Sequence, residues 1–114
     1  MVTFRRLFLR YADDRDGNVI VDVLMDARRR RVSRVPTGGW WGRVGTRELW
    51  PFVLTDDGRM DFGSAADNPP PDAERYARID LDDRILAVGE PFAVEYCGER
   101  WPVKLERVTD VAAL

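Results

Sequence analysis

The C-terminal third of the chain alternates apolar and polar residues in two runs that a short turn separates. Every second residue of segments 92–96 and 101–105 is apolar, and charged residues such as Glu95 and Lys104 fall on the other side of an extended chain. This period of two is typical of half-buried strands. Segment 97–100 includes a glycine, which can take the positive φ that a tight turn requires. The pattern therefore predicts a β-meander with one apolar face.

The rest of the chain carries similar but less regular patterns. We expect strands over 2–11, 19–27, 47–55 and 60–62, and a short strand over 32–35. Asp-Gly pairs in the intervening segments predict turns between neighbouring strands. Segment 37–46 holds four of the nine glycines and two of the four tryptophans, a composition that predicts an irregular segment.

The fold class follows from these patterns. No stretch shows a helical period, and three consecutive prolines in segment 63–72 favour an extended internal loop. The parts on either side of this Pro-rich loop are each too small to bury a core alone, so we expect one domain over 1–114 with a flexible tail over 109–114. The predicted fold is all-β, with about six to eight short strands in an antiparallel β-sandwich or a partly open small β-barrel and little or no helix. The predicted core comprises Phe8, Val21, Val23, Leu49, Phe52, Ile79, Val94, Trp101, Val103 and Leu105.

Composition fits a globular protein that folds without disulfides. The chain has 114 residues, of which 45% are hydrophobic and 33% charged, and it has one cysteine. No apolar run approaches the roughly 20 residues that a membrane helix needs, and the first residues do not resemble a signal peptide. We therefore expect a cytoplasmic protein that makes no membrane contact.

Charge is unevenly distributed, although the net charge is only −2. Residues 1–55 carry 11 arginines and 6 acidic residues, whereas residues 56–114 carry 7 basic and 14 acidic residues. If these halves form separate faces, the molecule is dipolar and can steer a charged partner. If their strands interleave, the asymmetry largely cancels.

The sequence lacks the usual equipment of an enzyme. It has no histidine, which is the commonest general base and transition-metal ligand. It has neither a nucleophile elbow nor a phosphate-binding loop, and Cys97 lies in a predicted turn with no histidine to activate it. Segment 14–17 is similar to the start of a calcium loop, but Ala12 and Val23 stand where that loop needs ligands. We therefore expect no catalytic residue, no cofactor and no metal site.

Arginines close to tryptophans make nucleic-acid binding one alternative. Guanidinium groups pair with phosphates, and aromatic rings stack on bases. The candidate contacts are Arg28, Arg29, Arg30, Arg31 and Arg34, with Trp40 and Trp41 nearby. A sequence pI near 5.2 and a single lysine argue against this alternative.

Protein binding is favoured by the tryptophans and by the acidic second half of the chain. Tryptophan and arginine are enriched at binding hot spots. Trp40 and Trp41 are adjacent, so in an extended chain they cannot both face the core, and we expect at least one to be exposed. The candidate partner-binding residues are Trp40, Trp41, Arg43, Asp56, Asp57, Asp82, Asp83, Glu95 and Glu99.

Segment 79–108 leads from a strand to the motif V-G-E-x-F, then to a hairpin and to an aromatic-led strand that ends in valine. This pattern resembles small bacterial β-proteins, among them immunity proteins of polymorphic and contact-dependent toxin systems. The resemblance implies a non-enzymatic binder. With the acidic second half, it leads us to expect a toxin-neutralising immunity protein whose partner is a basic toxin domain. Nucleic-acid binding and a structural role in a phage or secretion assembly remain alternatives, and the oligomeric state is open.

Overall fold

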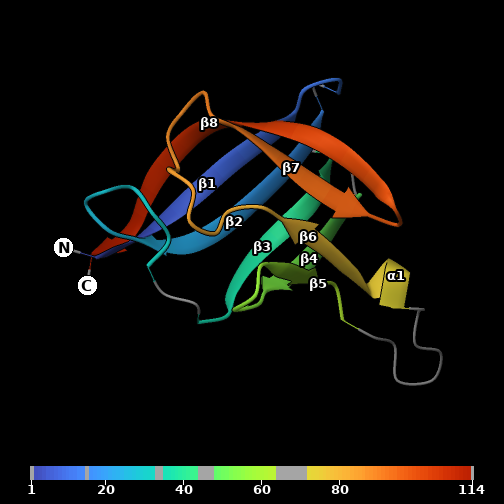
Figure 1. The fold of residues 1–114 in the computed structure, drawn as a ribbon, viewed down its shortest axis with the longest axis horizontal. Coiled ribbons are helices and arrows are strands. Elements are labelled where there is room, and N and C mark those ends of the chain that lie inside the picture. The colour runs from blue at the N-terminus through green and yellow to red at the C-terminus, as the bar shows by residue number, and fades with distance from the viewer. Residues whose placement is uncertain (1, 15, 33–34, 44–47, 64–71, 114) are drawn as a thin grey trace.

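The computed structural model describes residues 2–14, 16–32, 35–43, 48–63 and 72–113 (Figure 1). These residues form eight strands and one helix of four residues. In chain order the elements are β1 (Thr3–Tyr11), β2 (Gly17–Met25), β3 (Thr37–Arg43), β4 (Leu49–Leu54), β5 (Arg59–Asp61), α1 (Asp72–Arg75), β6 (Tyr76–Ile79), β7 (Pro91–Tyr96) and β8 (Glu99–Ala113). The expected all-β fold with little helix is confirmed.

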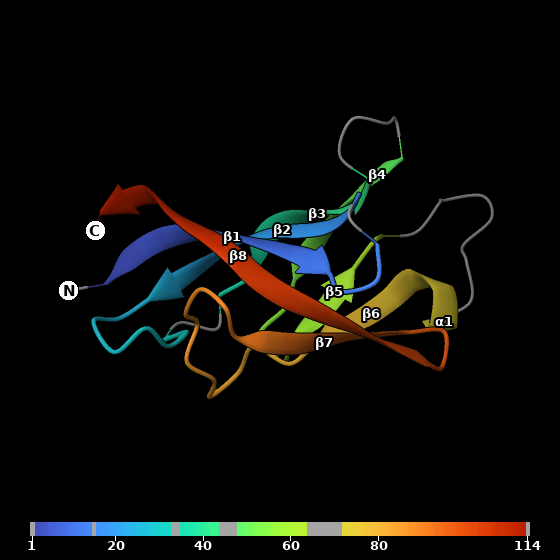
Figure 2. The same cartoon turned by 90° about the horizontal axis from the view of Figure 1, so that it is seen from above.

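The strands form a closed antiparallel barrel in which each strand pairs with the next one in the chain. The barrel closes because β8, with 15 residues, is long enough to pair with two neighbouring strands. Its first residues pair with β7, and its remainder pairs with β1, from Tyr11↔Val103 to Thr3↔Ala113. Figures 1 and 2 both show β1 and β8 side by side. Of the architectures that the sequence leaves open, the protein has the small barrel, and closure pairs both edges of its sheet.

The meander keeps the basic and acidic halves of the chain apart. Strands β1–β4 belong to the basic half and β5–β8 to the acidic half, and their sequential order makes them opposite parts of the barrel wall. At the seam between β1 and β8, opposite charges pair across the strands: Arg5 with Asp110 at 3.1 Å, and Arg10 with Glu106 at 3.2 Å. The strands of the two halves do not interleave, so the charge asymmetry of the sequence becomes a difference between two sides of the molecule.

Segment 37–46, predicted to be irregular, instead contains strand β3. The glycines were interpreted as a sign of irregular structure, but in β3 they permit a close approach between backbones. A Cβ atom on Gly39 would overlap both the ring of Phe52 on β4 and the carbonyl oxygen of Ile20 on β2. Glycine therefore lets β3 pair closely with its neighbours. Residues 44–46 lie outside the described part of the chain.

The predicted flexible tail is wrong for residues 109–113, which continue β8. They pair with β1, where Thr109 lies opposite Arg6 and Asp110 opposite Arg5. The segment forms a strand because the backbone of β1 needs hydrogen-bonding partners along its whole length. Its own side chains alternate poorly, so the sequence pattern concealed this strand.

The expected strand over 32–35 is not formed by its described residues. The preceding Arg31 makes one isolated bridge to Met25, and both Val32 and Val35 are exposed. Residues 33 and 34 lie outside the described part of the chain. The same holds for residues 64–71 of the predicted Pro-rich loop, whose last residue begins α1.

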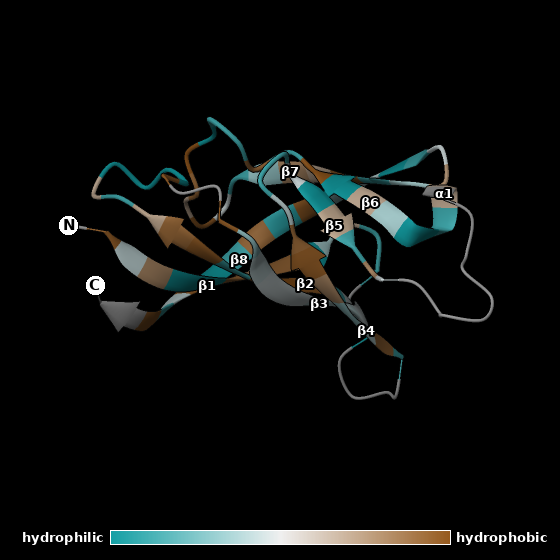
Figure 3. Ribbon diagram, turned by 90° about the horizontal axis from the view of Figure 1, so that it is seen from below, coloured by the Kyte–Doolittle hydropathy of each residue, from teal (hydrophilic) through white to brown (hydrophobic). Residues whose placement is uncertain are grey.

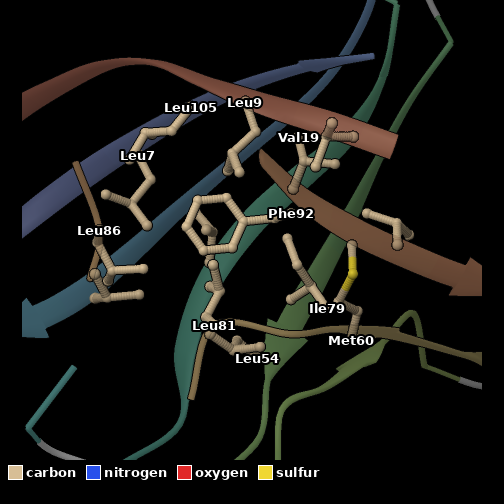
Figure 4. Close-up of a cluster of buried hydrophobic side chains, with 14 of the residues drawn as sticks. Leu7, Leu9, Val19, Leu54, Met60, Ile79, Leu81, Leu86, Phe92 and Leu105 are labelled. Atoms are coloured by element: carbon tan, nitrogen blue, oxygen red, sulfur yellow. The ribbon is translucent and has the colours of Figure 1, made fainter. Parts of the chain in front are cut away.

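A continuous hydrophobic core fills much of the barrel interior (Figure 4). Inward and outward residues alternate along the strands, and Figure 3 shows this as bands of hydrophobic and hydrophilic colour along the ribbons. The ring of Phe92 lies among aliphatic side chains from strands on several sides (Figure 4). Seven residues of the predicted core belong to this cluster: Val21, Val23, Phe52, Ile79, Val94, Val103 and Leu105.

Three predicted core residues lie elsewhere. Leu49 is 43% exposed because it starts β4 at the rim of the barrel. Phe8 is only half-buried, since its neighbours Leu7 and Leu9 take the inward positions. Trp101 is also half-buried, because it lines cavities at one end of the barrel.

The connection between β6 and β7 closes one end of the barrel. Leu81 and Leu86 on this connection are each 1% exposed and belong to the core cluster. The backbone N–H of Leu86 also donates a 2.8 Å hydrogen bond to the carbonyl of Arg29, which lies on the connection between β2 and β3. We call this the closed end. Loop residues act here as core residues, which strand patterns alone do not indicate.

Candidate functional site

At the opposite end of the barrel, the inward-facing side chains are aromatic. Trp41 lies opposite the buried Val19 in the register, and Trp50 lies opposite Trp41. Trp101 lies opposite the buried Val94 in the same way. Cross-strand partners project from the same face of a sheet, so these tryptophans point into the barrel. We define the aromatic mouth as Tyr11, Trp41, Trp50, Phe62, Tyr96 and Trp101, which line the cavities at this end.

Trp41 lies at the centre of the aromatic mouth. Its ring centroid is 5.0 Å from that of Tyr96 and 5.4 Å from that of Phe62. The centroids of Trp101 and Tyr11 are 5.8 Å and 6.4 Å away. All four distances fall in the range of favourable aromatic pairs, so the rings hold one another in place.

Two cavities open between these rings. One has a volume of about 410 Å³ and is lined by Trp41, Trp50, Phe62, Glu74, Tyr96 and Trp101. The other has a volume of about 420 Å³, shares the three tryptophans, and extends to Tyr11 and Arg43. Each volume lies within the range of small-molecule sites in proteins, about 300–1,000 Å³. The aromatic mouth is thus a concave surface with mostly apolar walls.

Helix α1 places a carboxylate at the rim of the mouth. The Arg75 guanidinium donates two hydrogen bonds to Asp61 at 3.0 and 3.2 Å, and these lower the pKa of the Asp61 carboxyl. The Phe62 backbone N–H donates to the Arg75 carbonyl at 2.9 Å, and the Tyr96 hydroxyl donates to the Glu74 carbonyl at 3.0 Å. These contacts tie α1 to β5 and β7, and they hold Glu74 at the edge of the 410 Å³ cavity.

Tyr11, which lines the second cavity, has a buried hydroxyl group. Its hydroxyl is inaccessible to solvent and completes no hydrogen bond with a described residue. Burial raises the pKa of the Tyr11 phenol well above its ordinary value, the Trp41 indole opposes this rise, and the charges of Asp13 and Asp14 add to it. A buried hydroxyl without a hydrogen-bond partner costs about 1–3 kcal/mol of stability.

The structure divides the predicted partner-binding residues among several places. Trp41 and Arg43 lie at the end of the barrel that carries the aromatic mouth, where Arg43 pairs with Asp14 at 2.7 Å. Trp40 points outward, is 41% exposed, and lies beneath the Arg6 guanidinium at 5.6 Å. The expectation that at least one of the two adjacent tryptophans is exposed is therefore confirmed for Trp40.

Three of the acidic candidates do come together. Asp57, Asp82 and Glu95 line a depression of about 250 Å³ on the acidic side of the barrel wall. Each carboxylate is paired with an arginine at 3.0 Å, in the pairs Asp57–Arg59, Asp82–Arg31 and Glu95–Arg100. A hydrogen bond from the Thr55 hydroxyl also lowers the pKa of Asp57. The remaining candidates, Asp56, Asp83 and Glu99, are exposed at or beside turns. Arginine pairing reduces the acidic field that a basic partner would meet there.

The predicted arginine cluster has exposed members and one buried member. Arg28, Arg29 and Arg30 are exposed on the connection between β2 and β3. The Arg31 side chain is only 1% exposed, pairs with Asp82 at 3.0 Å, and donates to the Thr55 carbonyl at 3.1 Å. Arg31 therefore joins three connections at the closed end and cannot reach a nucleic acid. Arg34 lies outside the described residues, and nucleic-acid binding stays a prediction that rests on the three exposed arginines.

Most of the aromatic mouth was missed from the sequence. Tyr11 and Tyr96 are the last residues of β1 and β7, and Phe62 directly follows β5. Aromatic residues at strand ends on one side of a meander converge at one end of the barrel once the sheet closes. This recurrence at strand ends is the signal that could have found the site, but its interpretation requires the topology.

Comparison of the chain with protein-family models, curated proteins and solved structures gives no match. The part of the chain that the structure describes contains no helix long and apolar enough to cross a membrane. Among these same residues, no group of three or more acidic or cysteine side chains is arranged to hold a metal ion.

Proposed function

We propose that the protein is a non-enzymatic binding module that holds a small, partly apolar molecule in its aromatic mouth. One observation carries this proposal. Six aromatic side chains from around the barrel converge on two cavities at one end, whereas mostly aliphatic side chains pack the rest of the interior. Closed barrels of this size have room for side chains or for one small ligand.

Exposure at the mouth supports a binding role over a packing role. Trp50 points towards the barrel axis and is nevertheless 56% exposed. Large aromatic side chains contribute most to stability when water is excluded from them. A ligand seated between Trp50 and Trp41 would exclude water from both rings.

A titration with the neutral fluorescent probe 1-aminoanthracene tests the proposal. We expect saturable binding that weakens about ten-fold or more in Trp41→Ala and in Trp50→Ala, a loss of about 1.4 kcal/mol or more. Trp50→Ala removes an exposed side chain, so it remains informative if Trp41→Ala folds poorly. The matched control is Trp40→Ala, which removes the adjacent, outward-facing tryptophan and should leave the affinity within about two-fold. Unchanged affinity in both mouth variants would contradict the proposal.

A protein partner is the second candidate, and an apolar row on the outer wall favours it. The register places Phe8, Ile20, Trp40 and Pro51 side by side across β1–β4. Trp40 is the most prominent member of this outer row, and exposed tryptophans are enriched at binding hot spots. The expected immunity function belongs to this candidate, but the outer row lies on β1–β4, the basic side of the barrel, so the charge argument for a basic toxin domain does not apply to this surface.

Co-purification with the product of the neighbouring gene tests the second candidate. We expect a stable complex that Trp40→Glu weakens about ten-fold or more and that Trp50→Ala leaves intact, because only the first variant changes the outer row. Light scattering of the purified protein would also reveal the self-association that a structural subunit requires. Failure to co-purify, with both proteins folded, would remove the immunity function.

A further inference from the structure

The shape of the aromatic mouth narrows the chemistry of its ligand. Three ring pairs stand nearly perpendicular: Trp41 and Tyr96 at 82°, Tyr11 and Trp101 at 81°, and Phe62 and Tyr96 at 77°. Parallel rings would form a slot for a flat molecule. Trp41 is also inclined by 33° to Phe62 and by 50° to Trp101, so the rings of the mouth face several directions, which suits a compact, rounded group.

The charges at the mouth are predominantly negative. Among the described residues that line the two cavities, Arg43 is the only basic one, and it pairs with Asp14 at 2.7 Å and with Glu48 at 4.0 Å. The carboxylates of Asp13 and Glu74 form no ion pair with a described residue. The described residues of the mouth therefore combine aromatic faces with carboxylates that no described arginine pairs.

The tyrosine at this rim responds to that charge. Burial raises the pKa of the Tyr96 phenol, Cys97 raises it further, and the negative charge of Glu74 adds to the rise. The negative charge of Glu74 therefore acts at Tyr96, and both residues line the 410 Å³ cavity. A cation in this cavity would interact favourably with both the carboxylate and the aromatic faces.

Resting on the proposed function, we infer that the mouth binds a compact organic cation, such as a quaternary ammonium group, between Trp41, Tyr96 and Glu74. Aromatic faces attract alkylated cations through the ring quadrupole, most strongly where water is excluded. A quaternary ammonium group has no N–H to donate, so it suits walls that offer few acceptors. Five aromatic residues and one acidic residue, Glu74, line the described part of this cavity.

Choline and its neutral isostere 3,3-dimethylbutan-1-ol test the inference, because they share a shape and differ in one charge. By isothermal titration calorimetry, we expect choline to bind about ten-fold or more tightly than the isostere. Glu74→Gln should weaken choline binding several-fold and leave binding of the isostere unchanged. The matched control is Glu90→Gln, which changes an exposed glutamate on the connection that closes the other end of the barrel.

The outcomes separate this inference from the proposed function. If the isostere binds as tightly as choline, the inference of a cation site is wrong, and the mouth remains a site for neutral molecules. If Glu90→Gln weakens choline binding as much as Glu74→Gln, the effect comes from net charge and the inference also falls. If neither compound binds, the inference is overturned, and the 1-aminoanthracene titration decides whether the proposed function falls with it.

Discussion

Replacement of Gly39 by alanine is expected to lower the free energy of unfolding by about 3 kcal/mol or more, or to prevent folding. The added Cβ would overlap the ring of Phe52 and the carbonyl oxygen of Ile20. The ring can turn, but the carbonyl belongs to the backbone of the paired strand β2 and can move only if the strands separate. Urea denaturation followed by tryptophan fluorescence measures the change.

Gly38→Ala is the matched control, one residue away on the same strand. A Cβ at Gly38 meets no heavy atom within 4 Å. Alanine restricts the unfolded chain more than glycine does, so this variant should be neutral or more stable by up to about 1 kcal/mol. Equal destabilisation by the two substitutions would show that the pairing between β2 and β3 is misplaced.

Truncation of Leu86 to alanine is expected to cost about 2–5 kcal/mol of unfolding free energy, as for a fully buried leucine. Leu86 lies on a connection outside the strands, yet it is 1% exposed and packs in the core. Its removal would leave a cavity at the closed end, between strands that cannot collapse onto it. Thermal and urea unfolding of the purified variant give the magnitude.

The neighbouring Ile85 provides the control for Leu86. It is 50% exposed on the same connection, and its truncation removes a side chain of similar size. Ile85→Ala should change the stability by no more than about 0.5 kcal/mol. A Leu86→Ala variant as stable as Ile85→Ala would mean that the connection between β6 and β7 does not close the barrel.

The sequence correctly predicted an all-β fold, but it did not show which strands pair to close the barrel. Alternation locates a strand when one face is buried, and it located β7 and the first part of β8. It gives no information on which strands pair, so the partnership between β1 and residues 109–113 was missed. Composition was misleading at β3, because glycine that permits close approach looks the same in sequence as glycine that permits a turn.

The candidate site was only partly predictable. Trp41 and Arg43 were identified as binding residues, but they were grouped with acidic residues that lie elsewhere on the barrel. A tryptophan that lines a cavity and one that fills a core follow the same alternation, as Trp101 shows. A tryptophan in a cavity wall differs from one in the core by its position along the barrel axis. That position depends on the register of all eight strands.

The seam between β1 and β8 also affects how the chain folds. Every other strand pair joins neighbours in sequence, but this one joins the first strand to the last. Contacts between distant segments require a large loop to close first, which slows their formation. Docking of β8 on β1 is therefore expected late in folding. Because Thr3 lies opposite Ala113, a short linker between these ends would convert the seam into a hairpin. A chain permuted in this way, with new ends at the turn between β7 and β8, would form this pair early and close the barrel at a different seam.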